Sequence, residues 1–353
     1  MTFRQQLMFW LAAFIVFAFL LWLLSEILLP FVAGAALAYL LNPLTNRLER
    51  IGVNRTLAAL LMVGVMVVAF IVLALLIVPV MAEQLSALIS NIPGYVTRLQ
   101  RLLAEQNLPW LRRLIDAGQG SETMNDLLSQ GAVWLAAFLR SLWSGGKALI
   151  SIFSLLIVTP VVVFYLICDW PRIIATVQQW IPLAHRETVN ELAREIDSAI
   201  AGFLRGQTGV CLILGAFYAV SLSLVGLNFG LLIGLISGVI TFIPYVGSMT
   251  GLVLSVGVAI AQFWPDWTMI LLVLGIFLVG QFLEGNILAP KLVGESIGLH
   301  PVWLIFAMFA FGYLFGFVGL LVAVPLAAAI GVLMRFALRQ YLASPLYIGE
   351  KPD

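Results

Sequence analysis

Long apolar runs dominate the chain, and short polar segments separate them. Because a helix rises 1.5 Å per residue, about 20 apolar residues cross a hydrocarbon layer roughly 30 Å thick. The run from Leu7 to Leu41 is too long for one span and is interrupted at Pro30, so it predicts two spans, at 7–25 and 28–43. The run from Leu57 to Val80 predicts a third span.

Two polar segments interrupt this pattern, and both show helical periodicity. In 81–147, apolar residues recur at three- to four-residue spacing, which predicts helices that lie against the membrane surface or against each other. After a fourth span at 148–168, ended by Asp169 to Pro171, the segment 169–205 predicts an amphipathic helix. Its apolar face consists of Val189, Leu192, Ile196, Ile200 and Phe203. We interpret its charged face as a solvated surface, with ion coordination as the alternative.

The last third of the chain is punctuated by glycine and proline inside its apolar runs. The run from Phe229 to Phe263 is cut around Pro244, and each half of about 14 residues is too short for a full span. A re-entrant helical hairpin is the prediction. A span at 268–282 and a polar, glycine-rich connection from Glu284 to Pro301 follow. The run from Val302 to Leu338, interrupted by several glycines and a proline, predicts a second hairpin.

Such breaks point to function, because irregular backbone at membrane depth must be buried in protein or line a wet cavity. Secondary transporters place their substrates at paired broken helices, whose exposed helix ends and carbonyls bind ligands. An inverted repeat of two hairpins is therefore our hypothesis. The alternative is ordinary helix pairs in which small residues permit close packing.

The first group of candidate substrate-binding residues lies at the first break. Pro244 and Gly247 would shape the backbone there, and Tyr245 would offer a hydroxyl for a hydrogen bond to the solute.

The second group follows the span at 268–282. Gln281, Glu284 and Asn286 would supply polar contacts, and Glu284 is the candidate proton carrier because ionisable residues at membrane depth are costly and usually functional. The alternatives are a plain loop and a structural ion pair between Glu284 and Lys291.

The distribution of basic residues in short loops predicts the orientation. Arg47, Arg50 and Arg55 crowd the loop between the second and third spans, and Arg335 and Arg339 follow the last apolar run. Both termini are therefore expected in the cytoplasm. The long segment 81–147 is then outside, which its basic residues permit because segments longer than about 60 residues largely escape the rule.

These patterns divide the chain into six parts. They are three N-terminal spans (1–80), an extracytoplasmic amphipathic helical segment (81–147), a transmembrane helix (148–168), a cytoplasmic amphipathic helical segment (169–205), a C-terminal transport core with broken helices (206–340) and a cytoplasmic tail (341–353).

Composition excludes several classes of protein. Of the 353 residues, 62% are hydrophobic and 10% charged, too few charges to cover a soluble protein of this size. The net charge of +1 gives no reason to expect a nucleic-acid partner. Cys168 and Cys211 are isolated, so we expect no disulfide and no metal site. Motifs for nucleotide binding, metalloprotease or serine-hydrolase chemistry are absent, so we expect no enzyme, no ATP-driven pump and no cofactor.

Several motifs spread over the chain resemble those of the autoinducer-2 exporter (AI-2E) family of PerM-like bacterial permeases. They are AYLLNP at 38–43, FLRGQ at 203–207, FIPYVG at 242–247, GNILAPKLVG at 285–294, IGLHP at 297–301, FGFVG at 315–319 and VPL at 324–326. The resemblance implies a homo-oligomer in the bacterial inner membrane with about eight transmembrane segments. It also implies export of a small signalling molecule or exchange of sodium or lithium for protons. Ser248 departs from the family, which commonly has a second proline there.

The sequence therefore predicts an all-α polytopic membrane protein whose partners are the lipid bilayer and a small polar solute or cation. Our leading hypothesis is a secondary transporter that exports a small polar solute, such as an autoinducer-2-like molecule, by alternating access. A sodium (or lithium)/proton antiporter is the first alternative. A membrane scaffold that transports nothing is the second.

Overall fold

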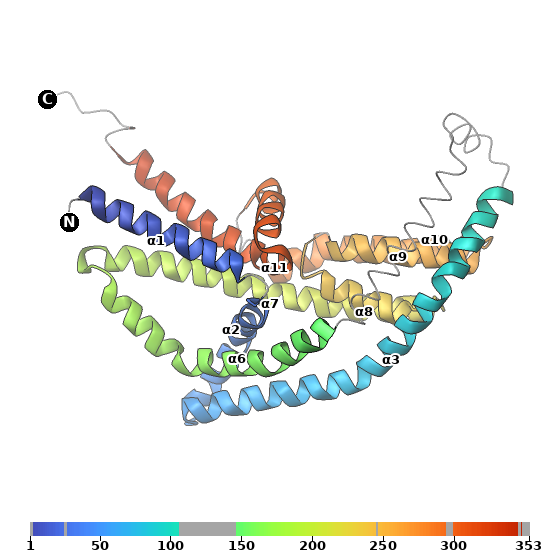
Figure 1. The fold of residues 1–353 in the computed structure, drawn as a ribbon, viewed down its shortest axis with the longest axis horizontal. Helices are drawn as coiled ribbons and strands as arrows, with labels where there is room; N and C mark the ends of the chain where they lie inside the picture. Colours follow the sequence, from blue (N-terminus) through green and yellow to red (C-terminus); the bar gives the residue numbers. More distant parts are fainter. Residues whose placement is uncertain are drawn as a thin grey trace. The chain divides into compact units, whose positions relative to one another are not determined.

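The computed structural model describes residues 3–24, 27–105, 146–244, 246–293, 299–344 and 347, and in them every regular element is a helix (Figure 1). Within these described residues, six helical stretches are long and apolar enough to cross a membrane. They are Arg55–Gln84, Leu156–Trp180, Leu183–Leu224, Val246–Phe263, Trp267–Val293 and Pro301–Leu342. The predicted class, an all-α polytopic membrane protein, is confirmed. The number of spans and the re-entry of the hairpins stay predictions.

The chain forms two compact units, each built from separate stretches of sequence. Unit 1 comprises Met1–Val67, Ser154–Gln207 and Pro290–Asp353, and unit 2 comprises Val68–Phe153 and Thr208–Ala289. Two of the longest helices, α3 (Arg55–Glu105) and α7 (Arg186–Leu224), contribute to both units. We describe the two units separately.

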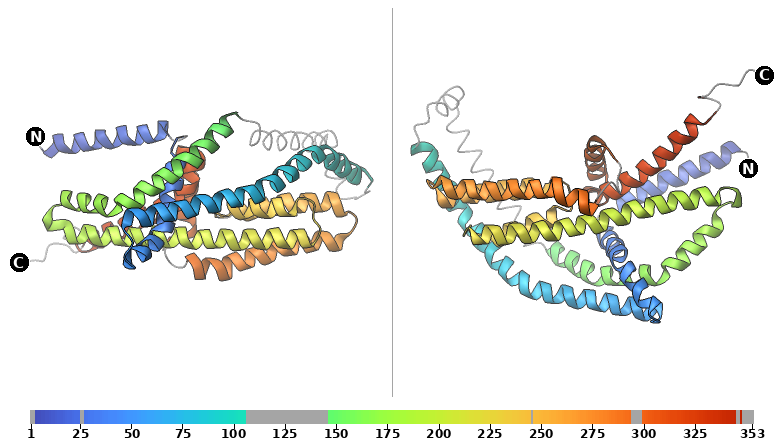
Figure 2. Two further views of the ribbon diagram at one scale, coloured as in Figure 1. Left: turned by 90° about the horizontal axis from the view of Figure 1, so that it is seen from below. Right: turned by 180° about the vertical axis from the view of Figure 1, so that it is seen from behind.

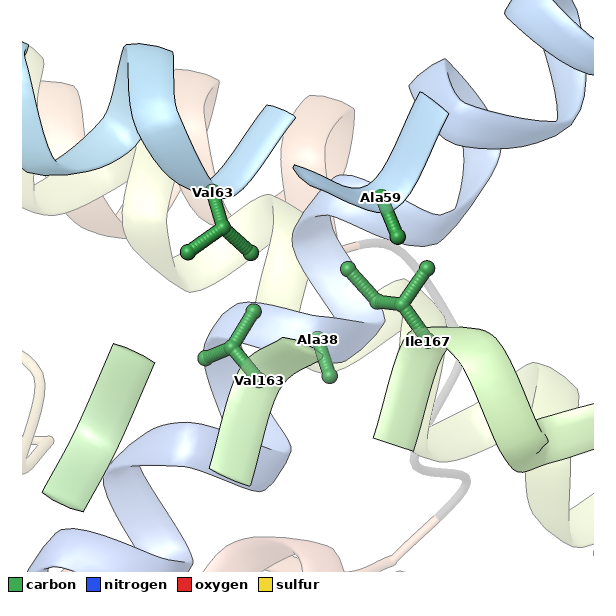
Figure 3. Close-up of a cluster of buried hydrophobic side chains, with 5 residues drawn as sticks. All are labelled: Ala38, Ala59, Val63, Val163 and Ile167. Carbon is green, nitrogen blue, oxygen red and sulfur yellow. The ribbon is translucent and has the colours of Figure 1, made fainter. Parts of the chain in front are cut away.

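Unit 1 contains the N-terminal helices and the ends of the chain. It includes α1 (Phe3–Leu23), α2 (Leu29–Arg50), the start of α3, most of α6 (Gly146–Trp180), a short 3₁₀ turn at Leu183–His185 and the start of α7. A small apolar cluster holds α2, α3 and α6 together (Figure 3). Its members are Ala38, Ala59, Val63, Val163 and Ile167.

Small residues allow α2 and α6 to approach closely. A methyl group on Gly34 of α2 would press against Val162 of α6, and the Thr159 hydroxyl donates to the Pro30 carbonyl at 3.4 Å. α6 does not stop at the polar residues 169–171, as the sequence suggested, but continues to Trp180. The helix therefore persists through these residues.

The amphipathic patterns of the two polar segments are helical where the structure describes them. α7 starts at Arg186 and runs without a break through the predicted amphipathic segment into the next apolar run, with Phe203 buried. α3 continues to Glu105, which confirms helix at the start of 81–147. Residues 106–145 of that segment lie outside the described part of the chain.

The last helix of unit 1 is bent back on itself. α11 (Pro301–Leu342) contains Gly316 at φ 60° and ψ −137°. Residues other than glycine rarely adopt this backbone conformation. A methyl group on Gly312 would touch Leu320, and one on Gly319 would overlap the Phe311 carbonyl, so the chain doubles back at Gly316 (Figure 2). The predicted interruption is present at Gly316, whereas Pro325 is accommodated inside the helix.

Unit 2 is built around a helical hairpin, as the first break predicts. α8 (Gly230–Ile240) and α9 (Val246–Phe263) pack against each other, and α9 packs in turn against α10 (Trp267–Leu283) (Figures 1 and 2). The two arms have 11 and 18 residues, so the halves are less equal than the sequence suggested.

Polar side chains fix the ends of these helices. Gln262 of α9 accepts from the Asn228 amide at 2.7 Å and donates to the Gly226 carbonyl at 2.8 Å, which secures the turn before α8. Gln84 of α3 accepts from the Leu232 amide in the first turn of α8 at 3.0 Å. Asp266 caps α10 by accepting from two amides of its first turn.

The polar connection predicted after the span at 268–282 is helical over its first part. Glu284–Val293 forms a π-helix that continues α10, and residues 294–298 lie outside the described chain. Pro290 lacks an amide hydrogen and so cannot make an ordinary α-helical bond, which is consistent with the wider turn. The glycine and polar residues of this connection are accommodated in a widened helix over 284–293, so the alternative of a plain loop does not hold there.

Candidate functional site

Close contacts between small residues bring the second half of α7 against α8 and α10 in unit 2. Gly234 and Gly238 of α8 lie against Ala219 and Gly215 of α7 so closely that a methyl group on either α8 glycine would overlap the α7 backbone. This packing is typical of membrane helices, whose association depends on backbone approach. Because the two helices lie so close together, a large side chain on this face of α7 is buried between neighbouring helices.

Tyr218 is that larger side chain. It is fully buried, and its ring stacks on Phe277 of α10 with centroids 4.5 Å apart and planes 15° from parallel. The tip of the ring lies directly against Gly280, where a methyl group would overlap the hydroxyl oxygen. Within the described chain, that buried oxygen has no hydrogen-bond partner.

Glu284 lies four residues, about one helical turn, after Gly280, at the point where α10 becomes the π-helix. One carboxylate oxygen, Oε2, is buried and has no hydrogen-bond partner among the described residues. The carboxylate is close enough to the Tyr218 hydroxyl and the Cys211 thiol to interact electrostatically with both. Short π-helical stretches within α-helices are frequent at functional sites.

Tyr218 Oη and Glu284 Oε2 are two buried oxygens that lack hydrogen-bond partners among the described residues. A buried polar atom that lacks a hydrogen bond costs about 1–3 kcal/mol, and native structures contain few of them. A proton or a hydrogen-bond donor on a solute could satisfy Glu284 Oε2, and either a donor or an acceptor could satisfy Tyr218 Oη, because a tyrosine hydroxyl does both. No group of three or more His, Cys, Asp or Glu side chains suited to a metal ion occurs in the described residues.

The first break is tightly packed around Gly247. A methyl group on this glycine would overlap the backbone and hydroxyl of Thr241, so the turn closes only because residue 247 has no side chain. The Thr241 hydroxyl donates to the Ser237 carbonyl at 2.7 Å, and Ser248, the departure from the family pattern, is buried. Pro244 is half-buried in the turn.

The six residues proposed from the sequence do not share one environment. Glu284 turns an oxygen inward, whereas Gln281 and Asn286 are exposed, and the Asn286 amide donates to the Phe282 carbonyl at 3.1 Å. Tyr245 lies outside the described residues. Solute binding by these residues stays a prediction.

Sequence reasoning missed Tyr218. Its position in the sequence could have indicated a special role. Tyrosine in membrane proteins usually lies near the ends of spans, where its hydroxyl reaches water. Tyr218 falls in the middle of the run at 208–227, with Gly215 and Ala219 on the same helical face.

Comparison with known proteins decides the family. A sequence profile of AI-2E family transporters matches residues 11–339. The chain belongs to the AI-2E transporter family. It is therefore a multi-pass membrane protein of a bacterial permease family, as the motifs indicated.

Relatives align with this AI-2E protein over most of their length. YrrI, a candidate transport protein of Bacillus subtilis strain 168, is 33% identical over 321 residues, which are 90% of this chain and 89% of YrrI. PerM, a candidate permease of Escherichia coli K12, is 30% identical over 316 residues, 87% of this chain and 86% of PerM. The AI-2 transport protein TqsA of Escherichia coli K12 is 25% identical over 327 residues, 90% of this chain and 86% of TqsA.

Proposed function

We propose that this protein is a secondary transporter of the bacterial inner membrane that exports a small polar solute by alternating access without ATP. The observation that carries the proposal is that two buried oxygens, Tyr218 Oη and Glu284 Oε2, lack hydrogen-bond partners in the part of the chain that the structure describes, near the transition from α10 to the π-helix. Both the α8–α9 break and this transition provide irregular backbone of the kind that transporters use for binding.

The name of TqsA guides the choice of solute. Since that relative is named for AI-2 transport, an autoinducer-2-like signalling molecule is the first solute to test. Pro244 and Gly247 would shape the site, Tyr245, Gln281 and Asn286 would contact the solute, and Glu284 would carry the coupling proton. Both termini would be cytoplasmic, and the protein would work as a homo-oligomer.

The experiment uses everted membrane vesicles with and without the full-length protein. A pH-sensitive dye reports proton flux after addition of an autoinducer-2-like solute or of sodium, lithium or potassium salts. The expected result is a protein-dependent collapse of the pH gradient on addition of the solute. Glu284→Gln should abolish it, because an amide cannot release a proton, and Tyr218→Phe should reduce it.

Glu187→Gln is the matched control, since this exposed carboxylate lies at the start of α7 and outside the proposed site. It should leave flux unchanged. A response to one cation alone, dependent on Glu284, would replace solute export by cation/proton antiport. Undiminished coupling in Glu284→Gln would remove the proton-carrying role from Glu284.

A scaffold would behave differently. If the protein only bound partners, disrupting the first break by Pro244→Ala together with Gly247→Ala would spare its cellular function, while deletion of 81–147 would not. Transport predicts loss of solute flux on damage at the break.

A further inference from the structure

A cavity within unit 1 is separate from the residues assigned to transport. It has a volume of about 230 Å³ and lies among α2, α6 and the start of α7. Its polar or aromatic lining groups are Tyr39, Asn42, Trp170 and Asp197. Cavities that hold drug-sized ligands measure roughly 300–1,000 Å³, so this one suits a smaller group.

Two aromatic rings form part of the wall. The rings of Tyr39 and Trp170 meet edge to face, with centroids 5.7 Å apart and planes at 70°. Aromatic rings attract cations to their faces within about 6 Å of the centroid. Ala35 and Ala38 lie on the same side of α2 as Tyr39, and their short side chains leave the space open.

Among the described residues that line the cavity, Asp197 has the only charged side chain. Asp197 and Tyr39 both line the cavity, which places the carboxylate and the aromatic ring at the same site. None of the ion pairs found within the described chain includes Asp197, whereas Glu195, two residues earlier, pairs with Arg335 at 3.3 Å and Arg339 at 3.8 Å. The residue is exposed, so the carboxylate can be reached from outside.

One cation, Arg55, reaches a lining residue of the cavity, but it is paired with a different carboxylate. Arg55 reaches Asn42 at the edge of the cavity, with Nη2 3.4 Å from Asn42 Oδ1, but its charge is paired with Glu49 at 2.9 Å. The cavity therefore combines one available carboxylate, two aromatic rings and an apolar floor. An anion would be repelled by Asp197, and a neutral polyol would not require it.

We propose that this cavity binds a small organic ammonium group, held by the Asp197 carboxylate and by the rings of Tyr39 and Trp170. Such a group can come from a free amine or from the ethanolamine headgroup of a lipid. Trp170 favours a place near the membrane surface, where tryptophan is enriched and both sources are present.

The test measures thermal unfolding of the purified full-length protein. In detergent, ethanolammonium chloride is titrated against the neutral comparator ethylene glycol, and in nanodiscs phosphatidylethanolamine is compared with phosphatidylglycerol. A ligand that binds only the folded protein raises the midpoint with concentration. We expect stabilisation by the ammonium compounds alone, and an apparent affinity about tenfold weaker in Asp197→Asn, as loss of a charged contact predicts.

Glu191→Gln is the matched control, because this exposed carboxylate lies on α7 outside the cavity, and it should bind normally. Stabilisation by free ethanolammonium would show that a soluble amine is sufficient for binding. Stabilisation by phosphatidylethanolamine alone would identify the lipid headgroup as the ligand. Either result supports the site. Equal stabilisation by ethylene glycol, or an unchanged affinity in Asp197→Asn, would overturn it.

A second variant keeps the proposal testable if Asp197→Asn fails to fold. Trp170→Leu keeps an apolar side chain but removes the aromatic face, and it should weaken ethanolammonium binding severalfold. If Asp197→Asn does not fold, unchanged binding in Trp170→Leu overturns the proposal and weakened binding supports it.

Discussion

Arg55 supplies a hydrogen bond that a proline removes from α6. Pro171 has no amide hydrogen, so the carbonyl of Ile167, four residues earlier, loses its α-helical partner. Arg55 Nε donates to that carbonyl at 3.0 Å. The other guanidinium nitrogens bond to three side chains of α2, namely Asn42, Asn46 and Glu49. This network ties the start of α3 to both α2 and α6.

Replacing Arg55 by lysine should therefore destabilise the protein. A lysine has one ammonium group and cannot reproduce the planar fork of a guanidinium, so the Ile167 carbonyl would be left without a partner. We expect a loss of about 1–3 kcal/mol, measured as a lower midpoint of thermal unfolding. Arg50→Lys, an exposed position at the end of α2, is the control and should change the midpoint little.

Burial also separates neighbouring polar residues that look equivalent in the sequence. Gln281, Glu284 and Asn286 fall within six positions, but only Glu284 has a buried polar atom without a hydrogen-bond partner among the described residues. Its neighbour in space, Tyr218, comes from a different helix. The buried Glu284 oxygen without a partner among the described residues is the basis for the prediction that Glu284→Gln abolishes coupled flux.

At the scale of elements, glycine decides where helices may turn or touch. Gly247 and Gly257 both lie on α9, but only Gly247 faces a neighbour, the backbone of Thr241, at a distance that excludes a methyl group. Gly257 has open space around the position of a Cβ atom. Gly257 is therefore a matched control for a substitution at Gly247.

Gly247→Ala should disturb the hairpin of α8 and α9. The added methyl group must displace the Thr241 backbone, and such overpacking costs about 1–3 kcal/mol. Gly257→Ala should be neutral or stabilise the helix by up to about 1 kcal/mol. Thermal unfolding of both variants checks this. Equal midpoints would mean that the turn can relax and that Gly247 is not required for its closure.

Helix continuity is another property of elements that local polarity did not reveal. α6 passes through Asp169 to Pro171, and α10 continues as a π-helix through Pro290 to Val293. In both cases a proline interrupts one hydrogen bond without ending the helix. A carbonyl freed by proline can be satisfied by a distant side chain or by a change of helical pitch.

At the scale of the whole molecule, the distribution of charge by itself predicts the orientation of the chain in the membrane. Basic residues crowd the loop at 47–55 and the end of the last helix, so both termini should be cytoplasmic. Green fluorescent protein fused to the C-terminus should therefore be fluorescent, and alkaline phosphatase fused there should be inactive. A fusion of alkaline phosphatase within 106–145 should be active, because that segment is predicted to be extracytoplasmic.

An active phosphatase at the C-terminus would reverse this orientation. The segment at 169–205 would then be outside, and so would Asp197 of the proposed ammonium cavity. The binding experiment on purified protein does not depend on orientation, so the two predictions can fail separately.

The sequence by itself determined the class of the protein, most helical segments, the two breaks and the family. These are local properties: the length of an apolar run, the lack of an amide hydrogen in proline and the freedom of glycine are present in each short stretch. Only the tertiary structure decided that Tyr218 lies against Gly280, that Arg55 bonds to the Ile167 carbonyl, and that Asp197 lines a cavity. Such contacts join residues far apart in the chain, and no local pattern specifies which of many apolar helix faces will meet.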